Sequence, residues 1–517
     1  MRRILLRAPV LSEVRLFWAR TRATMILDAL ILAAASLALY VATLAPTVTW
    51  GDDVTLQLRA IEGQLRANAG SHPLWVVIAH LFTRFSIGEL AFRVNLVSAV
   101  SAAATIGLLY LVLRSLRIMR WACVLATIAF AVSHTFWAHA VRTEVYTLML
   151  ATLALLLLVT FRWYHTRRRR YLVLIGVSIG LSLTTHLLAV LYLPALLWLI
   201  TSQHRRLRGG DIALLAASTV LALMPLCFLL WMDAQRLHMD LGALLRWAVF
   251  TFDGYDFSGN MMRFSLVTWP SDAAQWLGFL GYQFAGLAIF FGLFGVWMSR
   301  KSLPWELAVC VALLYVSSIV FAFSYQVGDR YVFYLPSYLA FSIWVALGVQ
   351  WFLKTRDGRR RAVLGVLLLG LLAMVPVVTY RVAPTAVAQL GLSQSRDARR
   401  VPGPNGLYWL LWPPKANYFD ARNYAEAALA RAPVNAVLLA DPVLASPMQY
   451  LQRIENVRPD VLIRFCCWDI EEILISRTGR PIVLADVSPT IYPIERLLKD
   501  YEIEPASPIY LLTPHHE

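Results

Sequence analysis

Long runs of apolar residues dominate the first 380 positions of the 517-residue chain. A bilayer core about 30 Å thick needs about 20 apolar residues in a helix to cross it. Nine runs meet or approach that length, at 25–45, 94–113, 121–138, 145–161, 212–232, 276–299, 304–322, 332–353 and 362–380. A helix satisfies its own backbone hydrogen bonds, which lipid cannot do, so each run is predicted to be a membrane-spanning helix.

A further uncharged stretch, 171–201, is interrupted near Thr184, Thr185 and His186. It is too long for one ordinary crossing and short for two, and we interpret it as two short helices that meet at His186. The first apolar run begins at Met25 and lacks a small-residue cleavage site, so it is expected to be an uncleaved crossing. The sequence therefore predicts about eleven crossings.

The basic residues support this count. Half of the 47 Lys and Arg residues, 24 of them, lie in six loops at 1–22, 114–120, 162–170, 205–208, 300–301 and 354–361. If 171–201 crosses twice, all six loops fall on one side, which the positive-inside rule makes cytoplasmic. The N-terminus is then cytoplasmic and the C-terminal tail is extracytoplasmic. The absence of any Asn-x-Ser/Thr site favours a bacterial inner membrane, with the tail in the periplasm.

The composition changes at about residue 381. The segment 381–415 is rich in Pro, Gly and Arg and is predicted to be a linker or irregular segment. After it, three short buried strands at 436–441, 461–465 and 481–486 alternate with helical segments near 420–431, 446–454, 469–477 and 493–501. This alternation is typical of a small α/β unit with a parallel sheet. We therefore expect a membrane domain at 1–380, the linker, and an extracytoplasmic α/β domain at 416–517.

Composition and charge agree with an α-helical polytopic membrane protein. The chain is 59% hydrophobic and 15% charged, against about 45–50% and about 25% in soluble domains. A net charge of +16 would suggest nucleic acid in a soluble protein. Here the residues from 381 onward are nearly neutral, with 14 basic and 15 acidic residues, so the excess belongs to the membrane loops. No nucleic-acid partner is expected, and the expected partner is membrane lipid.

Ionisable residues collect at helix ends on the side opposite the basic loops. They are Asp52, Asp53, His72, His139, Arg142, Glu144, His186, Asp329 and Arg330. Such groups near the hydrocarbon boundary are costly and tend to be functional. Structural roles stay open: the two Asp residues could cap a helix, His72 could be a turn residue, His186 an interior residue, and Asp329–Arg330 a surface pair.

The segment 138–146 contains four of the candidate residues, His139, Arg142, Glu144 and Tyr146. If it is helical, His139, Arg142 and Tyr146 share a face, and Glu144 points elsewhere. A structural Arg142–Glu144 pair is the alternative. No metal-ligand spacing, Gly-rich phosphate loop or Ser-His-Asp order occurs in the sequence, so those chemistries gain no support.

Several strings, in this order, resemble one family. They are APTVTWGDD (45–53), SHPLW (71–75), RVNLVSA (93–99), FWAHAVRTEVYTL (136–148), GLSLTTHLL (180–188), YQVGDRYVFYLPSY (325–338) and the tail segment 436–463. Together they resemble the membrane glycosyltransferases of the C-type fold that are related to transmembrane protein O-mannosyltransferases. The sequence departs from the family in two places. Thr55 stands where the family usually has a Glu, three residues after the first Asp, with Asp53 as a possible substitute, and the His-Pro segment is shortened to His72–Trp75.

The resemblance implies an inverting transfer of a mannose-like sugar from a polyprenyl-phosphate carrier to an extracytoplasmic acceptor. The acceptor could be a protein Ser/Thr hydroxyl, a glycan or a lipid head group. Inversion requires a base for the acceptor hydroxyl, with Asp52 the first candidate and Asp53 the second. The departing phosphate requires positive charge or hydrogen-bond donors, and the candidates are Arg142 and His139, then His72, His186 and Arg330. Glu144, Tyr146 and Asp329 are further candidates for the site.

No obligatory metal or other cofactor is expected beyond the lipid-linked donor, although two carboxylates could hold a divalent ion. The rival hypothesis is a transporter or flippase for a lipid-linked sugar, which predicts inverted repeats and a site near the midplane. A third is a sensor or scaffold whose membrane part anchors the tail. It explains poorly why polar residues recur at several helix ends.

Overall fold

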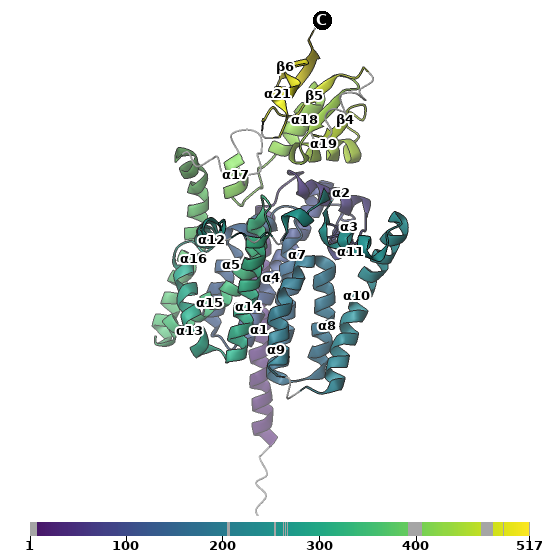
Figure 1. Cartoon of the computed structure of the whole chain (residues 1–517). Helices are drawn as coiled ribbons and strands as arrows, with labels where there is room; N and C mark the ends of the chain where they lie inside the picture. The colour runs from purple at the N-terminus through teal and green to yellow at the C-terminus, as the bar shows by residue number, and fades with distance from the viewer. Residues whose placement is uncertain are drawn as a thin grey trace, which may run out of the picture.

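The computed structural model describes residues 8–203, 207–252, 255–261, 263, 265, 267–390, 406–466, 479–489 and 491–515. Upright helices form a membrane bundle, and a small domain that contains a β-sheet covers one end of it (Figure 1). We call this the tail end of the bundle and the opposite one the basic end. Helix α1 begins at the basic end, so the two ends of the chain lie on opposite sides of the bundle.

The bundle is built from helices of very different lengths. Its long helices are α1 (Ala8–Ala42), α4 (Leu90–Ser115), α7 (Tyr146–Thr166), α8 (Arg169–Thr185), α10 (Gly209–Leu237), α13 (Leu287–Ser302), α14 (Trp305–Ser324), α15 (Leu335–Lys354) and α16 (Gly358–Gln389). Shorter elements are α2 (Asp52–Glu62), α3 (Pro73–Phe82), α5 (Arg120–Ala131), α6 (His134–Ala140), η1 (Leu187–Tyr192), α9 (Leu193–Thr201), α11 (Leu241–Phe250), β1 (Thr251–Phe252), β2 (Tyr255–Asp256), η3 (Ser258–Asn260), α12 (Trp269–Gln283) and η4 (Arg330–Tyr334).

Within the described residues, seven helices are long and apolar enough to cross a membrane. The number rises to nine if each of two bent helix pairs is one span. Membrane character is thus established, and the count of eleven stays a prediction.

Three predicted runs are broken helices in the structure. The chain bends by 66° between α5 and α6, and by 114° between α12 and α13, where Gly286 has φ 74°. The run at 276–299 is therefore divided between two helices, because the backbone at Gly286 leaves the helical region. The stretch 171–201 is also divided, as expected: α8 ends at Thr185, and η1 begins after His186.

Close packing of α8 on α10 shows how small residues hold the bundle together. A Cβ added to Gly176 would lie 2.1 Å from Ser218 Oγ, and one added to Gly180 would lie 2.4 Å from Ala222 Cβ. In lipid there is no hydrophobic force between helices, so close backbone approach through small residues supplies the packing energy. The i, i+4 spacing of the two glycines places both on the face that meets α10.

The tail domain contains a five-stranded sheet in the order β4-β3-β5-β7-β6. Strands β3 (Val437–Ala440), β4 (Leu462–Phe465) and β5 (Ile482–Leu484) are parallel, and β6 (Tyr501–Ala506) and β7 (Ile509–Pro514) are antiparallel. The accompanying helices are α17 (Gly406–Leu411), α18 (Asp420–Arg431), α19 (Pro442–Glu455) and α21 (Ile494–Leu497).

The three predicted strands are present, but the sheet is mixed rather than parallel. The helix predicted at 493–501 is present but shorter, as α21 (Ile494–Leu497), and Tyr501 already belongs to the β6–β7 hairpin, in which Glu502 and Glu504 alternate with Tyr501 and Ile503 at the period of a strand. Helix α16 continues to Gln389, so the irregular segment begins later than residue 381; Ala383, Ala386 and Ala388 favour the helix. The predicted helix at 469–477 lies outside the described residues.

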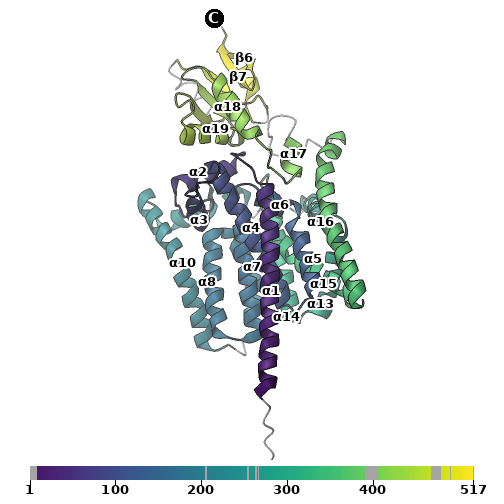
Figure 2. The ribbon, with the colours of Figure 1, turned by 180° about the vertical axis from the view of Figure 1, so that it is seen from behind.

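The tail domain packs directly on the outer loop of the bundle (Figure 2). Val54 and Leu58 of α2 share one buried apolar cluster with Leu444 and Met448 of α19. Polar contacts surround this core, among them Trp50 Nε1 donating to the Tyr418 hydroxyl at 2.7 Å. The loop that carries the predicted catalytic Asp residues is therefore held between the bundle and the tail.

Candidate active site

Helix α2 starts at the two adjacent Asp residues and gives them different surroundings. Gly51 precedes them at φ 58° and ψ −127°, a conformation open mainly to glycine. Asp52 is half-buried, whereas Asp53 is 1% exposed and accepts a 2.7 Å hydrogen bond from Thr49 Oγ1. One carboxylate thus reaches the surface and the other is fixed inside.

The segment 138–146 is not one helix, so the condition under which His139, Arg142 and Tyr146 would share a helix face is not met. Helix α6 ends at Ala140, and the next five residues form a turn held by side chains of α4. Ser98 Oγ donates to the Glu144 carbonyl and accepts from the Glu144 backbone N–H, both at 3.0 Å, and Thr143 Oγ1 donates to Asn95 Oδ1 at 2.5 Å. Because these polar groups replace helical hydrogen bonds, Glu144 turns toward Arg142 instead of away from it.

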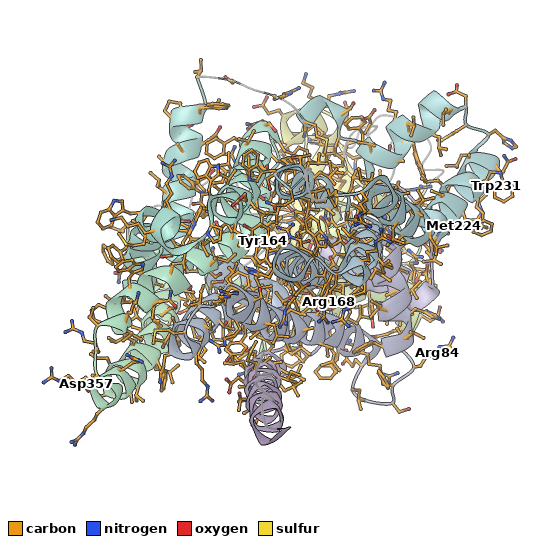
Figure 3. All side chains as sticks on the ribbon, turned by 90° about the horizontal axis from the view of Figure 1, so that it is seen from below. Arg84, Tyr164, Arg168, Met224, Trp231 and Asp357 are labelled. Atoms are coloured by element: carbon orange, nitrogen blue, oxygen red, sulfur yellow. The ribbon has the colours of Figure 1, made fainter. Side chains whose placement is uncertain are left out.

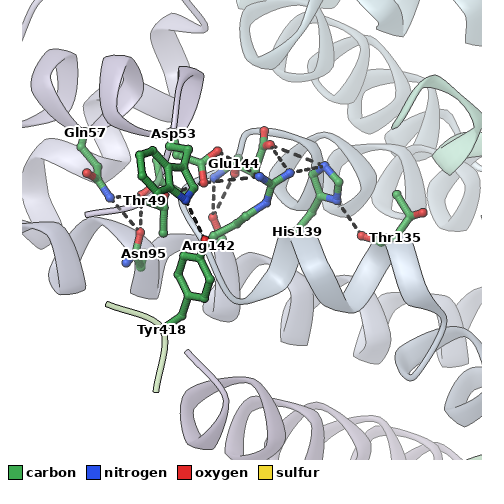
Figure 4. A network of polar contacts seen from close by, with 12 residues as sticks. Thr49, Asp53, Gln57, Asn95, Thr135, His139, Arg142, Glu144 and Tyr418 are labelled. Atoms are coloured by element: carbon green, nitrogen blue, oxygen red, sulfur yellow. Dashed lines mark hydrogen bonds and ion pairs between the residues drawn. The ribbon is translucent and has the colours of Figure 1, made fainter. Parts of the chain in front are cut away.

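Arg142 is the centre of a buried polar network (Figure 4). Its Nη2 lies 2.9 Å from Glu144 Oε1, and its Nη1 lies 3.4 Å from Asp53 Oδ1. Nη2 also donates to His139 Nε2 at 3.2 Å. Two carboxylates and an imidazole therefore fix the guanidinium, whose side chain is only 11% exposed. The structural Arg142–Glu144 pair exists, and it forms part of a larger cluster.

His139 orients Arg142 as a neutral ring. Its Nδ1 is 2.7 Å from the Thr135 carbonyl, which can only accept, so the proton lies on Nδ1. Nε2 is then free of a proton and accepts from Arg142. His139 is fully buried, and this arrangement makes it a positioning group for the guanidinium.

A row of rings links His139 to the other predicted histidines. The His139 and Tyr146 ring centroids are 5.5 Å apart, those of Tyr146 and His186 are also 5.5 Å apart, and those of His186 and His72 are 4.6 Å apart. The structure therefore brings together residues from α3, α6, α7 and the break after α8. The two rings in closest contact, His72 and His186, are more than one hundred residues apart in sequence.

His72 is not suited to be a positive phosphate clamp. Burial lowers the pKa of His72 well below its usual value, and the neighbouring His186 and Arg59 lower it further. His72 Nδ1 faces the Thr185 carbonyl at 3.1 Å. A neutral His72 carries no charge near pH 7, and its one N–H, on Nδ1, is directed at the Thr185 carbonyl, so Nε2 can only accept.

Asp329 and Arg330 do not form the surface pair considered as an alternative. Arg330 Nη2 lies 2.7 Å from Asp272 Oδ1 and donates to Gln275 Oε1 at 2.6 Å, so it is bound to α12. Asp329 instead lines a small cavity beside Arg142. The two neighbours thus face different parts of the protein.

The cavity lies where the bundle meets the tail. It has a volume of about 30 Å³, the space of about one water molecule. Trp50, Arg142, Glu144, Asp329, Tyr331, Val332, Trp409 and Leu410 line it. Trp409 of α17 lies with its ring centroid 5.2 Å from the Arg142 guanidinium carbon. Helix α17 therefore forms part of the wall of this cavity.

Two cations at this site were missed in the sequence. Lys415 is 2% exposed, its Nζ lies 5.3 Å from the Trp409 ring centroid, and it donates to the Trp412 and Pro413 carbonyls. Burial lowers the pKa of Lys415 well below its usual value, Arg142 lowers it further, and Asp53 opposes both. Burial also lowers the pKa of Arg59 to about 10, with Asp52 opposing that change. Neither residue stands in a motif; Arg59 lies on α2 two turns after the Asp pair, whereas only folding brings Lys415 near it.

Carboxylates and imidazoles do not gather into a metal-binding group of three or more anywhere in the described part of the chain. The carboxylates of Asp53 and Glu144 instead both face the Arg142 guanidinium. The site thus has a fixed positive charge beside Asp53, and the half-buried Asp52 directly precedes Asp53 in the first turn of α2.

Comparisons with known proteins agree with the motifs. Residues 68–208 match the family described as the protein O-mannosyl-transferase TMEM260 N-terminal domain, which confirms the resemblance predicted from the sequence. The crystal structure of ArnT from Cupriavidus metallidurans bound to undecaprenyl phosphate superposes with a TM-score of 0.56 at 13% identity. This similarity covers 93% of this chain and 97% of ArnT.

The chain has the C-type glycosyltransferase fold. A second similar structure of this fold is the arabinofuranosyltransferase AftD from Mycobacteria, at 14% identity and a TM-score of 0.51. The match covers 94% of this chain but 40% of AftD. A search of curated protein sequences found no match.

Proposed function

We propose that this C-type-fold protein is an inverting glycosyltransferase that moves a sugar from a polyprenyl-phosphate carrier to a hydroxyl acceptor. The observation that carries the proposal is the buried Arg142, which faces the cavity while Asp53, Glu144 and His139 fix its orientation. A guanidinium held in this way can stabilise charge that develops on a departing phosphate.

In the proposed reaction, the acceptor oxygen attacks the anomeric carbon as the bond from that carbon to the phosphate oxygen breaks. The bonding electron pair leaves with polyprenyl phosphate, whose charge Arg142 stabilises. The acceptor proton passes to Asp52. We prefer Asp52 to Asp53 as the base because Asp52 is half-buried, whereas Asp53 is held by Thr49 and Arg142.

The resemblance to O-mannosyltransferases favours a mannose-like sugar and a protein Ser/Thr hydroxyl, with glycan and lipid acceptors as alternatives. The location of the candidate residues favours transfer over transport. Asp52 and Asp53 begin α2 and His72 precedes α3, and both helices lie at the end of the bundle below the tail domain (Figure 1), whereas a transporter site is expected near the midplane.

The test uses detergent-purified full-length protein and radiolabelled polyprenyl-phosphate mannose with peptide, glycan and lipid acceptors. A missing general base should lower kcat by about 10²- to 10⁴-fold in Asp52→Asn, with donor binding retained. Asp240→Asn is the control, because Asp240 is an exposed helix cap that Asn replaces well. The anomeric configuration of the product, read by NMR, reports inversion.

Unchanged turnover in both Asp52→Asn and Asp53→Asn would contradict the base assignment. A wild-type protein that transfers no sugar, but moves the lipid-linked sugar across a vesicle membrane, would instead support the transporter hypothesis.

A further inference from the structure

A second cavity lies at the basic end of the bundle, on the side away from the candidate active site. It occupies about 220 Å³ between the end of α7 and the beginnings of α8 and α10. Its lining consists of Trp163, Arg167, Arg169, Leu172, Leu207, Arg208 and Asp211. Figure 3 shows the bundle from this end, with the neighbouring Tyr164 and Arg168 near the middle of the view.

The cavity has an excess of positive charge. Three arginines line it against a single carboxylate, Asp211. Asp211 is already engaged, since it accepts from Arg169 Nε at 2.8 Å and from the Arg208 backbone N–H at 3.0 Å. The lining therefore carries a net charge of about +2 at neutral pH, because Arg stays protonated.

Arg167 is held in place before any ligand binds. It closes α7 with φ 57°, and its guanidinium carbon lies 5.0 Å from the Trp163 ring centroid and 4.9 Å from that of Tyr164. Its Nη2 donates to Gln203 Oε1 at 2.7 Å. A fixed guanidinium loses little freedom when it binds an anion, so part of the entropic cost of binding is avoided.

Apolar surface continues from the cavity onto the lipid-facing side of the bundle. Leu172 and Leu207 line the cavity itself. Near the beginnings of α8 and α10, Leu174 and Ile212 are 44% and 58% exposed. A ligand that suits this site has an anionic head and an apolar body. Trp163 and Tyr164 beside it are residues typical of the membrane interface.

We propose that this cavity binds the phosphate of an anionic phospholipid head group, with the acyl chains along α8 and α10. Arginines bind phosphate oxygens through charge-assisted hydrogen bonds. The volume equals that of roughly seven water molecules at about 30 Å³ each, which suits a phosphate group with part of its hydration. Basic pockets between membrane helices are known to bind such head groups.

The test measures lipid binding to the full-length protein in detergent by native mass spectrometry. The ligands are short-chain phosphatidylglycerol, short-chain phosphatidylcholine and inorganic phosphate. Removal of two charges in Arg169→Gln/Arg208→Gln should weaken phosphatidylglycerol binding by about tenfold or more. The opposite change, Asp211→Asn, adds net positive charge and should tighten it.

The matched control is Arg359→Gln/Arg360→Gln, which removes two charges from the beginning of α16 without touching the cavity. Phosphatidylglycerol binding unaffected by the cavity variants, or weakened equally by the control, overturns the proposal. Inorganic phosphate binding that depends on the same arginines, without phosphatidylglycerol binding, overturns the lipid assignment. The readout is binding, so the result is independent of whether the protein transfers sugar.

Discussion

Arg142 and Glu144 form a 2.9 Å ion pair although a single residue separates them in sequence. In a continuous helix, residues two apart point in different directions. The pair exists because α6 ends at Ala140 and Ser98 of α4 binds both backbone groups of Glu144. The broken helix therefore places a carboxylate where it fixes the guanidinium of the candidate site.

Arg142→Lys tests whether two-point fixation of this cation matters. Lysine keeps the charge, but its single ammonium group lacks the planar arrangement of N–H donors through which Arg142 contacts Asp53 and Glu144 at the same time. We expect kcat to fall by about 10²- to 10³-fold, the usual cost of a lost transition-state donor. Steady-state transfer kinetics provide the measurement, with the exposed Arg360→Gln as control. Equal kcat in Arg142→Lys and wild type would rule out this role.

Trp409→Ala tests the contribution of helix α17 to the site. Trp409 lies over Arg142 and lines the cavity, so its loss removes a cation–π contact worth about 0.5–2 kcal/mol. We expect kcat/KM to fall by about tenfold, since about 1.4 kcal/mol corresponds to a factor of ten. Trp409→Phe should retain most activity. Trp231→Ala on the exposed face of α10 is the control. If Trp231→Ala lowers kcat/KM as much as Trp409→Ala does, the loss does not come from the contact with Arg142.

The lowered pKa of His72 predicts a loss of stability in acid. The unfolded chain takes up a proton near pH 6.5, but the folded protein does not, so stability falls as the pH drops below that value. The loss is about 1.4 kcal/mol per pH unit. The thermal midpoint in detergent should drop between pH 7.5 and 5.5, and drop less in His72→Asn.

His238→Asn is a matched control for this pH series. His238 has φ 50° against 49° for His72, and it is exposed. Asn accepts this left-handed conformation well. If both variants show the same pH dependence as the wild type, His72 does not account for the acid sensitivity.

Gly180→Ala tests the packing of α8 on α10. The new Cβ would lie 2.4 Å from Ala222 Cβ, so the helices must separate, at a cost of about 1–3 kcal/mol. Gly370→Ala on α16 adds the same methyl group into open space and should leave the thermal midpoint unchanged or raise it. A midpoint for Gly180→Ala equal to that of Gly370→Ala would contradict this account of the interface.

Hydropathy and charge predicted much of the membrane part, including the break at His186, because a membrane helix must satisfy its own backbone within one segment. They did not predict the bends at α5–α6 and α12–α13, because an apolar run does not show where the backbone leaves the helical conformation, as it does at Gly286. In the tail, short strands were recognisable by their buried runs. The β6–β7 hairpin was missed, because the predicted helix at 493–501 ended where β6 begins and no element was predicted after it.

The candidate site was predicted less completely than the fold. Motifs singled out Arg142, His139 and Asp53, which the structure brings into contact. The position of Glu144 depended on hydrogen bonds from α4, and Lys415 enters from a segment that looks like a linker. Such contacts join residues from 46 to several hundred positions apart, and one sequence contains no signal for them.

The contact of the tail with α2 sets a delay in the biogenesis of this protein. Trp50 and Tyr418 are 368 residues apart, which ribosomes synthesise in about 20–70 s at about 5–20 residues per second. Throughout that interval the apolar face of α2, including Val54 and Leu58, is not yet covered by the residues of α19 that bury it in the complete protein. A nascent chain that stops before the tail thus carries the Asp pair on an uncovered helix. Premature release would yield a protein inserted in the membrane but open to aggregation and proteolysis at this loop.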